Sequence, residues 1–146
     1  MDIESLKYIF FGASILFCFF SFLRSEKLIE PSFFNKSAVI AVISTIIGIL
    51  FEKTNIFDMP VGIALVLMSL TTIYLLYFRI LHIIFLKWKR FDPHPMSRIQ
   101  DIGHYPFNKS KNKRVVIWED FVFTTLHVIL PIFSILFLLF YFAGRL

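Results

Sequence analysis

Three ionisable side chains fall inside stretches of sequence that are otherwise apolar enough to cross a membrane. Arg79 and His82 lie near the end of one such stretch, and His127 lies near the start of the last. Ionisable groups are costly in hydrocarbon, so they are candidates for function. At about 1.5 Å per residue all three reach a similar depth and could form one polar layer. Such a layer would relay a proton, clamp a ligand or switch charge. The structural alternative is that Arg79 snorkels to the headgroups and His127 forms a hydrogen bond between helices.

A second polar pattern follows one face of the last apolar stretch. Its members are spaced i, i+3, i+7 and i+10 and are Thr124, His127, Pro131 and Ser134. Residues at this spacing share a helix face. Because Pro131 has no N–H, we expect a kink there and a His127 carbonyl that a neighbouring helix or hydroxyl must satisfy. The pattern is typical of a packing face, and in a minority of membrane proteins of a gate.

The second apolar stretch carries a complementary pair of small residues. Ser44 and Gly48 are four positions apart, a spacing that lets two membrane helices approach closely. The partner is either the last stretch of the same chain or another protein, and we favour packing within the chain.

Metal and cofactor chemistry have weaker support. Two His and two Asp occur within a basic loop, namely Asp92, His94, Asp101 and His104. Their spacing fits no familiar metal site. Two histidines at similar depth, His82 and His127, are necessary for a haem between helices but not sufficient. We therefore expect no metal, no cofactor and, since no catalytic motif is present, no enzyme.

The elements that must position these residues are membrane helices. The chain has 146 residues, of which 58% are hydrophobic and 17% are charged, more apolar than a soluble domain. We predict an all-α membrane protein with a single polytopic domain over residues 1–146. Its four transmembrane helices are expected at about 8–23, 37–51, 59–86 and 119–143. The first two are short for a core of about 30 Å, so a re-entrant or interfacial hairpin is the alternative there.

The charges between the helices predict an orientation. The loop at about 87–117, roughly 30 residues between the third and fourth helices, carries eight Lys and Arg against two Asp. By the positive-inside rule this loop and residues 24–36 are cytoplasmic, so both termini lie outside. We expect a multi-pass protein of a bacterial inner membrane with periplasmic termini. Topology accounts for the basic charge, and no pattern for reading bases accompanies it, so we expect no nucleic-acid partner.

These features favour a function exerted by contact. We expect a small non-enzymatic protein that binds another membrane protein, or a membrane-inserting toxin, within the lipid bilayer. Bacteriocin-immunity and plasmid entry-exclusion proteins are similar in size, helix count and composition, although no motif is shared. One alternative is an accessory subunit or assembly factor of a membrane complex, and another is a small transporter or redox carrier that uses the Arg79/His82/His127 layer. A homo-oligomer is possible in each case.

Overall fold

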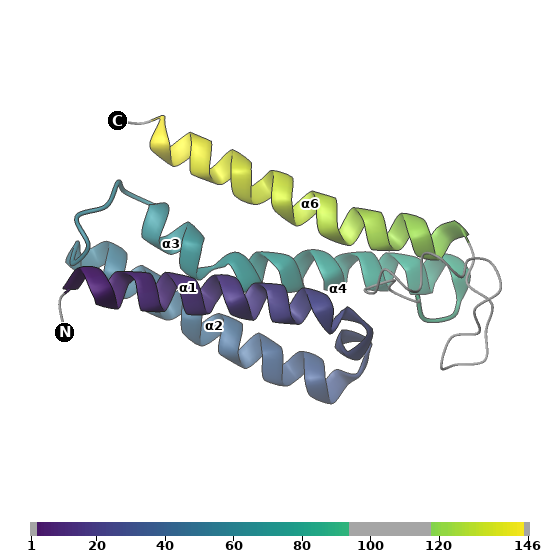
Figure 1. The fold of residues 1–146 in the computed structure, drawn as a ribbon. Helices are drawn as coiled ribbons and strands as arrows, with labels where there is room; N and C mark the ends of the chain where they lie inside the picture. The colour runs from purple at the N-terminus through teal and green to yellow at the C-terminus, as the bar shows by residue number, and fades with distance from the viewer. Residues whose placement is uncertain (1–2, 94–117, 145–146) are drawn as a thin grey trace.

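A computed structural model of the chain describes residues 3–93 and 118–144, and every regular element in these two ranges is helical (Figure 1). The elements are α1 (Ile3–Leu23), the 3₁₀ helix η1 (Ser25–Ile29), α2 (Pro31–Thr54), α3 (Ile63–Met68), α4 (Leu70–Lys89) and α6 (Trp118–Ala143). Four of them, α1, α2, α4 and α6, are long and apolar enough to cross a membrane. The all-α class with four potential membrane-spanning helices is therefore confirmed. Most of the basic loop lies outside the described residues.

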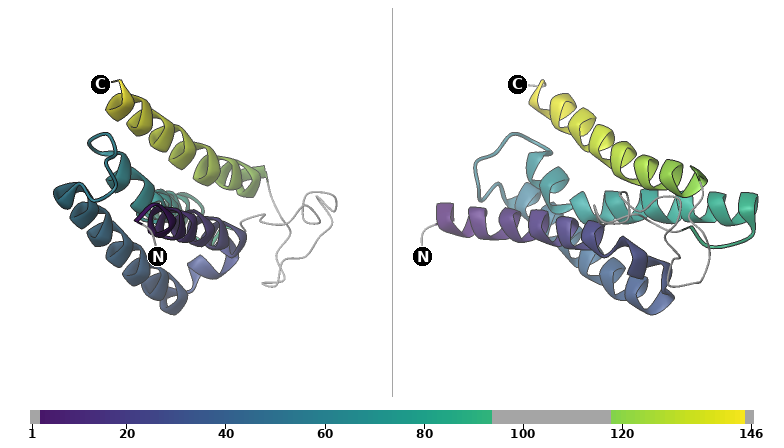
Figure 2. Two further views of the ribbon diagram at one scale, coloured as in Figure 1. Left: turned by 60° about the vertical axis from the view of Figure 1, so that its left-hand side comes forward. Right: turned by 45° about the vertical axis from the view of Figure 1, so that its right-hand side comes forward.

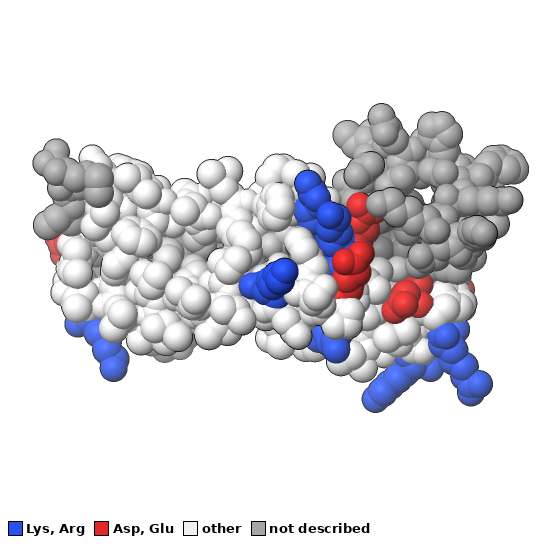
Figure 3. All heavy atoms as spheres, turned by 90° about the horizontal axis from the view of Figure 1, so that it is seen from below, with Lys and Arg blue, Asp and Glu red and all other residues white. Residues whose placement is uncertain are grey.

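The long helices run alternately up and down. Both ends of the chain lie at one end of the molecule, together with the loop between α2 and α3 (Figure 1). The opposite end holds η1 and the end of α4. On the face seen in Figure 3, charged side chains lie at one end of the molecule and over the opposite half. An uncharged band separates these two groups.

The first two helices are longer than the sequence blocks predicted. α1 has 21 residues and α2 has 24, which correspond to about 31 and 36 Å of helix. α2 begins early because Pro31 occupies its first turn, where the missing N–H costs nothing, and it ends at Asn55 in the left-handed conformation. Both helices therefore match the thickness of a hydrocarbon core.

The third apolar stretch differs from the single continuous helix that we expected over residues 59–86. It is divided at Ser69 into α3 and α4. The Ser69 N–H bonds to both the Leu65 and the Val66 carbonyls, and its hydroxyl also donates to the Val66 carbonyl. Bonds of the tighter 3₁₀ type interrupt the α-helical ladder at this point.

Hydroxyl groups from neighbouring helices bond to the carbonyls beside this break. Ser14 of α1 donates to the Leu67 carbonyl at 2.9 Å, and Ser44 of α2 donates to the Met68 carbonyl at 2.7 Å. In an apolar environment a carbonyl without a donor is costly, so these two bonds make the break tolerable. The sequence pattern shows neither bond, because each joins residues that are distant along the chain.

α4 lies at the centre of the bundle. It contacts α1, α2 and α6, and 39% of its most apolar window is buried, against 11% for α6. α6 lies along α4 near its own N-terminus and separates from it toward the C-terminus, where it lies beside α3 (Figures 1 and 2). The main core cluster joins Leu28 of η1, Ala41 of α2 and Phe123 of α6 to the aromatic face of α4.

Candidate functional site

The contact between α4 and α6 is centred on the ring of Phe78, which is fully buried. The rings of His82 and His127 both pack against it, with centroid distances of 6.1 and 5.7 Å. The structure thus brings these two candidate residues to one aromatic side chain, which lies against both imidazoles.

His127 is embedded in aromatic side chains. Besides Phe78, its ring contacts Phe123 of the preceding turn, Tyr74 of α4 and Phe22 of α1. Its Nδ1 lies 3.1 Å from the Phe123 carbonyl oxygen. A carbonyl only accepts hydrogen bonds, so Nδ1 carries the proton and Nε2 is the acceptor in the neutral ring. Nε2 is buried and has no partner among the described residues.

His82 binds a carboxylate beyond the end of its helix. α4 ends at Arg90 in the left-handed conformation, and the chain turns back so that Asp92 Oδ1 lies 2.9 Å from His82 Nε2. The side chain of His82 is 4% exposed and that of Asp92 is 46% exposed. A second pair, Lys89 with Glu119, joins the end of α4 to the start of α6.

Arg79 does not belong to this group. It follows Phe78 by one residue, which turns it about 100° around α4, and its side chain is exposed. Its guanidinium carbon lies 5.2 Å from the ring centroid of Phe34 in α2, a cation–π contact. The predicted three-member layer is therefore not assembled: Arg79 contacts Phe34 of α2, whereas His82 and His127 both pack against Phe78.

The polar face of α6 is directed toward α4. His127 and Pro131 are buried, and the Ser134 hydroxyl lies 2.6 Å from that of Tyr77 in α4. Thr124 donates to the Asp120 carbonyl within its own helix. The polar residues of the last helix therefore lie mainly in a helix–helix contact.

The small residues of α2 pack within the chain, against α3 and α4. A Cβ added to Gly48 would lie 2.7 Å from Met68 Cβ, so only glycine permits this approach. Next to Ser44, the Thr45 and Thr72 hydroxyls lie 2.8 Å apart, and Thr72 also donates to the Ala41 carbonyl. The sequence left two partners open, the last stretch of the same chain or another protein. The contact is made within the chain, but by the third apolar stretch and not by the last.

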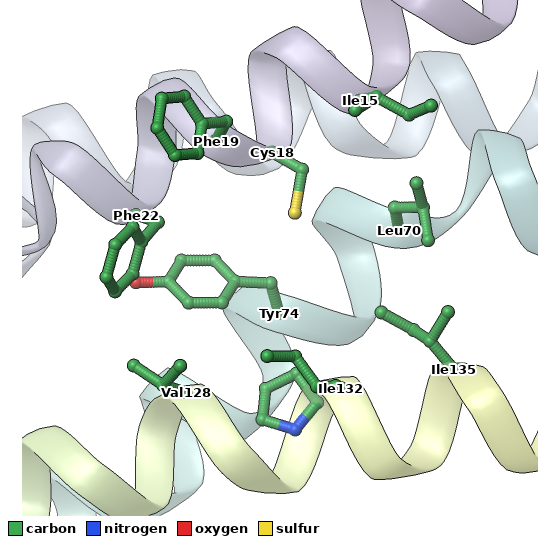
Figure 4. A pocket seen from close by; sticks show the side chains of 10 residues that line it. Ile15, Cys18, Phe19, Phe22, Leu70, Tyr74, Val128, Ile132 and Ile135 are labelled. Carbon is green, nitrogen blue, oxygen red and sulfur yellow. The ribbon is translucent and has the colours of Figure 1, made fainter.

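A cavity of about 380 Å³ lies between α1, α4 and α6 (Figure 4). Its wall is almost entirely apolar and consists of Ile15, Cys18, Phe19, Phe22, Leu70, Tyr74, Val128, Pro131, Ile132 and Ile135. Its volume falls in the range of small-molecule sites. Of these residues, only Pro131 is a candidate from the sequence pattern.

Tyr74 is the residue that the sequence analysis missed. It is 3% exposed, and its hydroxyl has no partner among the described residues. The helical spacing of Tyr74, Phe78 and His82, at i, i+4 and i+8, was the signal that would have placed it on the buried face of α4. The pairing of His82 with Asp92 had no such signal, because it depends on how the chain turns after α4.

In the part of the chain that the structure describes, no group of three or more His, Cys, Asp and Glu is arranged to hold a metal ion. His94, Asp101 and His104 lie outside the described residues.

Comparisons with known proteins add no family. The chain matches no protein-family model, and searches of curated proteins and of solved structures found no similar protein. The fold and its hydropathy define the class by themselves: a helical chain with four helices long and apolar enough to span a membrane, which is consistent with a multi-pass membrane protein.

Proposed function

We propose that this chain is a small non-enzymatic membrane protein that acts by contact with another protein inside the bilayer. The observation that supports this most directly is a ridge of aromatic side chains on α6. Phe133, Phe137 and Phe140 are spaced i, i+4 and i+7, so they share one face, and they are 68%, 69% and 76% exposed. Large rigid rings on an outward face suit packing against another helix.

The ionisable groups support the same proposal, because their contacts serve the fold. His82 binds Asp92, Lys89 binds Glu119, and Arg79 stacks on Phe34. These contacts join the ends of helices and cover the surface of α4. Because Arg79 lies apart from the two histidines, the three residues do not form the proton relay or ligand clamp of the alternative proposal.

The partner that we propose is a membrane-inserting toxin or a second membrane protein, as for immunity and exclusion proteins. The orientation that we propose has η1 and the basic residues after α4 in the cytoplasm and both termini in the periplasm of a bacterial inner membrane. The up-and-down course of the helices supports it, since it places both termini at one end (Figure 1). Reporter fusions at each terminus test this, and a cytoplasmic C-terminus would contradict it.

The contact is tested by truncating the ridge. Cells that produce the chain are challenged with a panel of pore-forming bacteriocins and with a conjugating plasmid, and survival and transfer frequency are measured. We expect the triple variant Phe133→Ala, Phe137→Ala and Phe140→Ala to lose protection. The matched control removes three exposed apolar side chains of α2, through Ile43→Ala, Ile46→Ala and Leu50→Ala, and should keep it.

The two other classes give different results. If His127→Phe, which leaves the ridge intact, abolishes protection while the ridge variant retains it, the proposal is wrong and the histidine carries the function. If the intact chain changes neither survival nor transfer, the accessory-subunit alternative replaces the immunity or exclusion proposal.

A further inference from the structure

The last helix, α6, is attached to the bundle unevenly along its length. Its four buried residues all lie in its first half, and they are Asp120, Phe123, His127 and Pro131. That half is joined to α4 by the aromatic contact and the ion pair described above. Within α6, which the structure describes in full, no residue after Pro131 is buried. The second half is therefore attached much less tightly than the first.

Two side chains attach this second half to the rest of the chain. The Ser134 hydroxyl, about one turn after the proline, lies 2.6 Å from the hydroxyl of Tyr77 in α4. Near the end of the helix the Phe142 ring lies against the backbone of Gly62, because a Cβ added to Gly62 would collide with three carbons of that ring. Toward its C-terminus α6 separates from α4 and lies beside α3 (Figures 1 and 2). The contact with Gly62 thus holds the end that lies farthest from α4.

Gly62 is fixed in the conformation that receives the ring. Its φ is +89°, in the left-handed region that residues with a side chain rarely adopt. Its N–H donates to Glu52 Oε1, near the end of α2, at 2.5 Å. The carboxylate and the left-handed backbone therefore hold a bare stretch of main chain in front of Phe142.

Pro131 marks the boundary between the two halves of α6. A proline has no N–H, so the His127 carbonyl cannot accept the helical hydrogen bond that would otherwise cross this point. Helices bend sharply mainly at positions of this kind. Next to the boundary, Ile132 and Ile135 form part of the wall of the cavity between α1, α4 and α6 (Figure 4). A movement of the second half at Pro131 would therefore change the width of that cavity.

We propose that residues 132–143 form a hinged arm, which pivots at Pro131 and is latched to the bundle by the contact of Phe142 with Gly62. Release of the latch moves Ile132 and Ile135 away from α1 and α4 and widens the cavity. The aromatic ridge lies on the same arm, on roughly the opposite side from Phe142, so the latch also determines where the ridge is presented. The proposal goes beyond the contact function, because the movement takes place within this chain and is measured without a partner.

The test measures the distance between the arm and α1 in the full chain, reconstituted in phosphatidylcholine nanodiscs. Cys18, the one cysteine, is replaced by Ser, and spin labels are attached through Ser5→Cys and Ala143→Cys, two exposed positions at one end of the molecule. Double electron–electron resonance should give one main distance for this parent chain. Phe142→Ala should raise the share of a second, longer distance by about fivefold to tenfold, as the loss of a half-buried ring predicts.

Two further variants and a second pair of labels control this measurement. Phe140→Ala removes a neighbouring ring that is 76% exposed and should leave the distances unchanged. Gly62→Ala pushes against the Phe142 ring from the other side and should act as Phe142→Ala does. Labels at Ser5→Cys and Thr54→Cys, near the start of α1 and at the end of α2, report on the rest of the bundle. Their distance should be the same in every variant.

The pivot is tested by adding Pro131→Ala to the Phe142→Ala chain. Alanine restores the N–H that the His127 carbonyl lacks, so the share of the longer distance should fall. If it does not fall, the pivot at Pro131 is wrong. Distances that stay unchanged in both Phe142→Ala and Gly62→Ala overturn the latch. A change in the second pair of labels overturns the arm, because the whole bundle has then loosened.

Discussion

The third apolar stretch, α3 together with α4, has two flanks that are packed in different ways. On the α2 flank the backbones approach so closely that Gly48 has no room for a Cβ, and hydroxyls such as that of Ser44 bond directly to carbonyls of the partner segment. On the α6 flank the rings of Phe78, Phe123 and His127 pack against one another and form the contact between the helices. The contact on the first flank is close around Ser44 and Gly48, whereas a cavity lies beside the second.

The difference follows from side-chain size. Small residues let helices meet backbone to backbone, so little space is left for any other molecule. Large rings pack well where they touch, but they cannot fill the space where the helices diverge. Recognition of a ligand or partner is therefore expected on the α6 flank, and structural integrity is expected to depend on the α2 flank and on the aromatic contact that anchors α6.

The aromatic contact gives the largest expected effect. His127→Ala removes a ring that is 1% exposed and packed against four other rings, so we expect the free energy of unfolding to fall by about 3 kcal/mol. His127→Phe keeps a ring of similar size and should cost less than about 1.5 kcal/mol. Titration with a denaturing detergent measures both. Equal losses for the two variants would mean that the imidazole nitrogens, rather than the packing of a ring, stabilise this flank.

The α2 flank is tested by adding one methyl group. Gly48→Ala places a Cβ 2.7 Å from Met68 Cβ, which forces α2 and α3 apart, and we expect a loss of about 1–3 kcal/mol in the same titration. The matched control is Gly12→Ala, because nothing lies within 4 Å of the added Cβ there. Alanine is the better helix former, so the control should gain up to about 1 kcal/mol. A stabilised Gly48→Ala variant would remove the contrast between the two flanks.

Much of the fold was accessible from the sequence because hydrophobic blocks and helix length are local properties. The block ending at Phe51 predicted a membrane helix, and the spacing of Ser44 and Gly48 predicted a close approach. The break at Ser69 was not accessible, since it depends on hydroxyl donors from α1 and α2 that meet it only in the folded chain. The direction of Arg79 was not accessible for a related reason: residue count estimates the depth of a residue along a helix, but it does not give its direction relative to the buried face of α4.

Hydrogen bonds at the α2 flank should contribute less to the free energy of unfolding than the close packing there. Ser44→Ala removes the hydroxyl that donates to the Met68 carbonyl, and bonds of this kind between membrane helices average about 0.6 kcal/mol. We expect a loss of that order, smaller than that of Gly48→Ala. Ser32→Ala, at an exposed position near the start of α2, serves as the control and should be neutral. If Ser44→Ala lowers the free energy of unfolding more than Gly48→Ala does, hydrogen bonds and not the short distance between the backbones stabilise this flank.

The smallest expected effect concerns the ion pair that joins the two helices of the α6 flank at one end. The side chains of Lys89 and Glu119 are 24% and 25% exposed, and pairs with access to water contribute about 0–1 kcal/mol. Lys89→Gln should therefore leave the free energy of unfolding almost unchanged, as should the control Lys87→Gln at an exposed position of the same turn. Hydrogen exchange separates the two variants, because only the loss of Lys89 frees the first turn of α6 from α4 and should speed exchange there. If exchange instead rises along the whole of α6, the ion pair holds the entire helix, and the aromatic contact at Phe78 is not what anchors it.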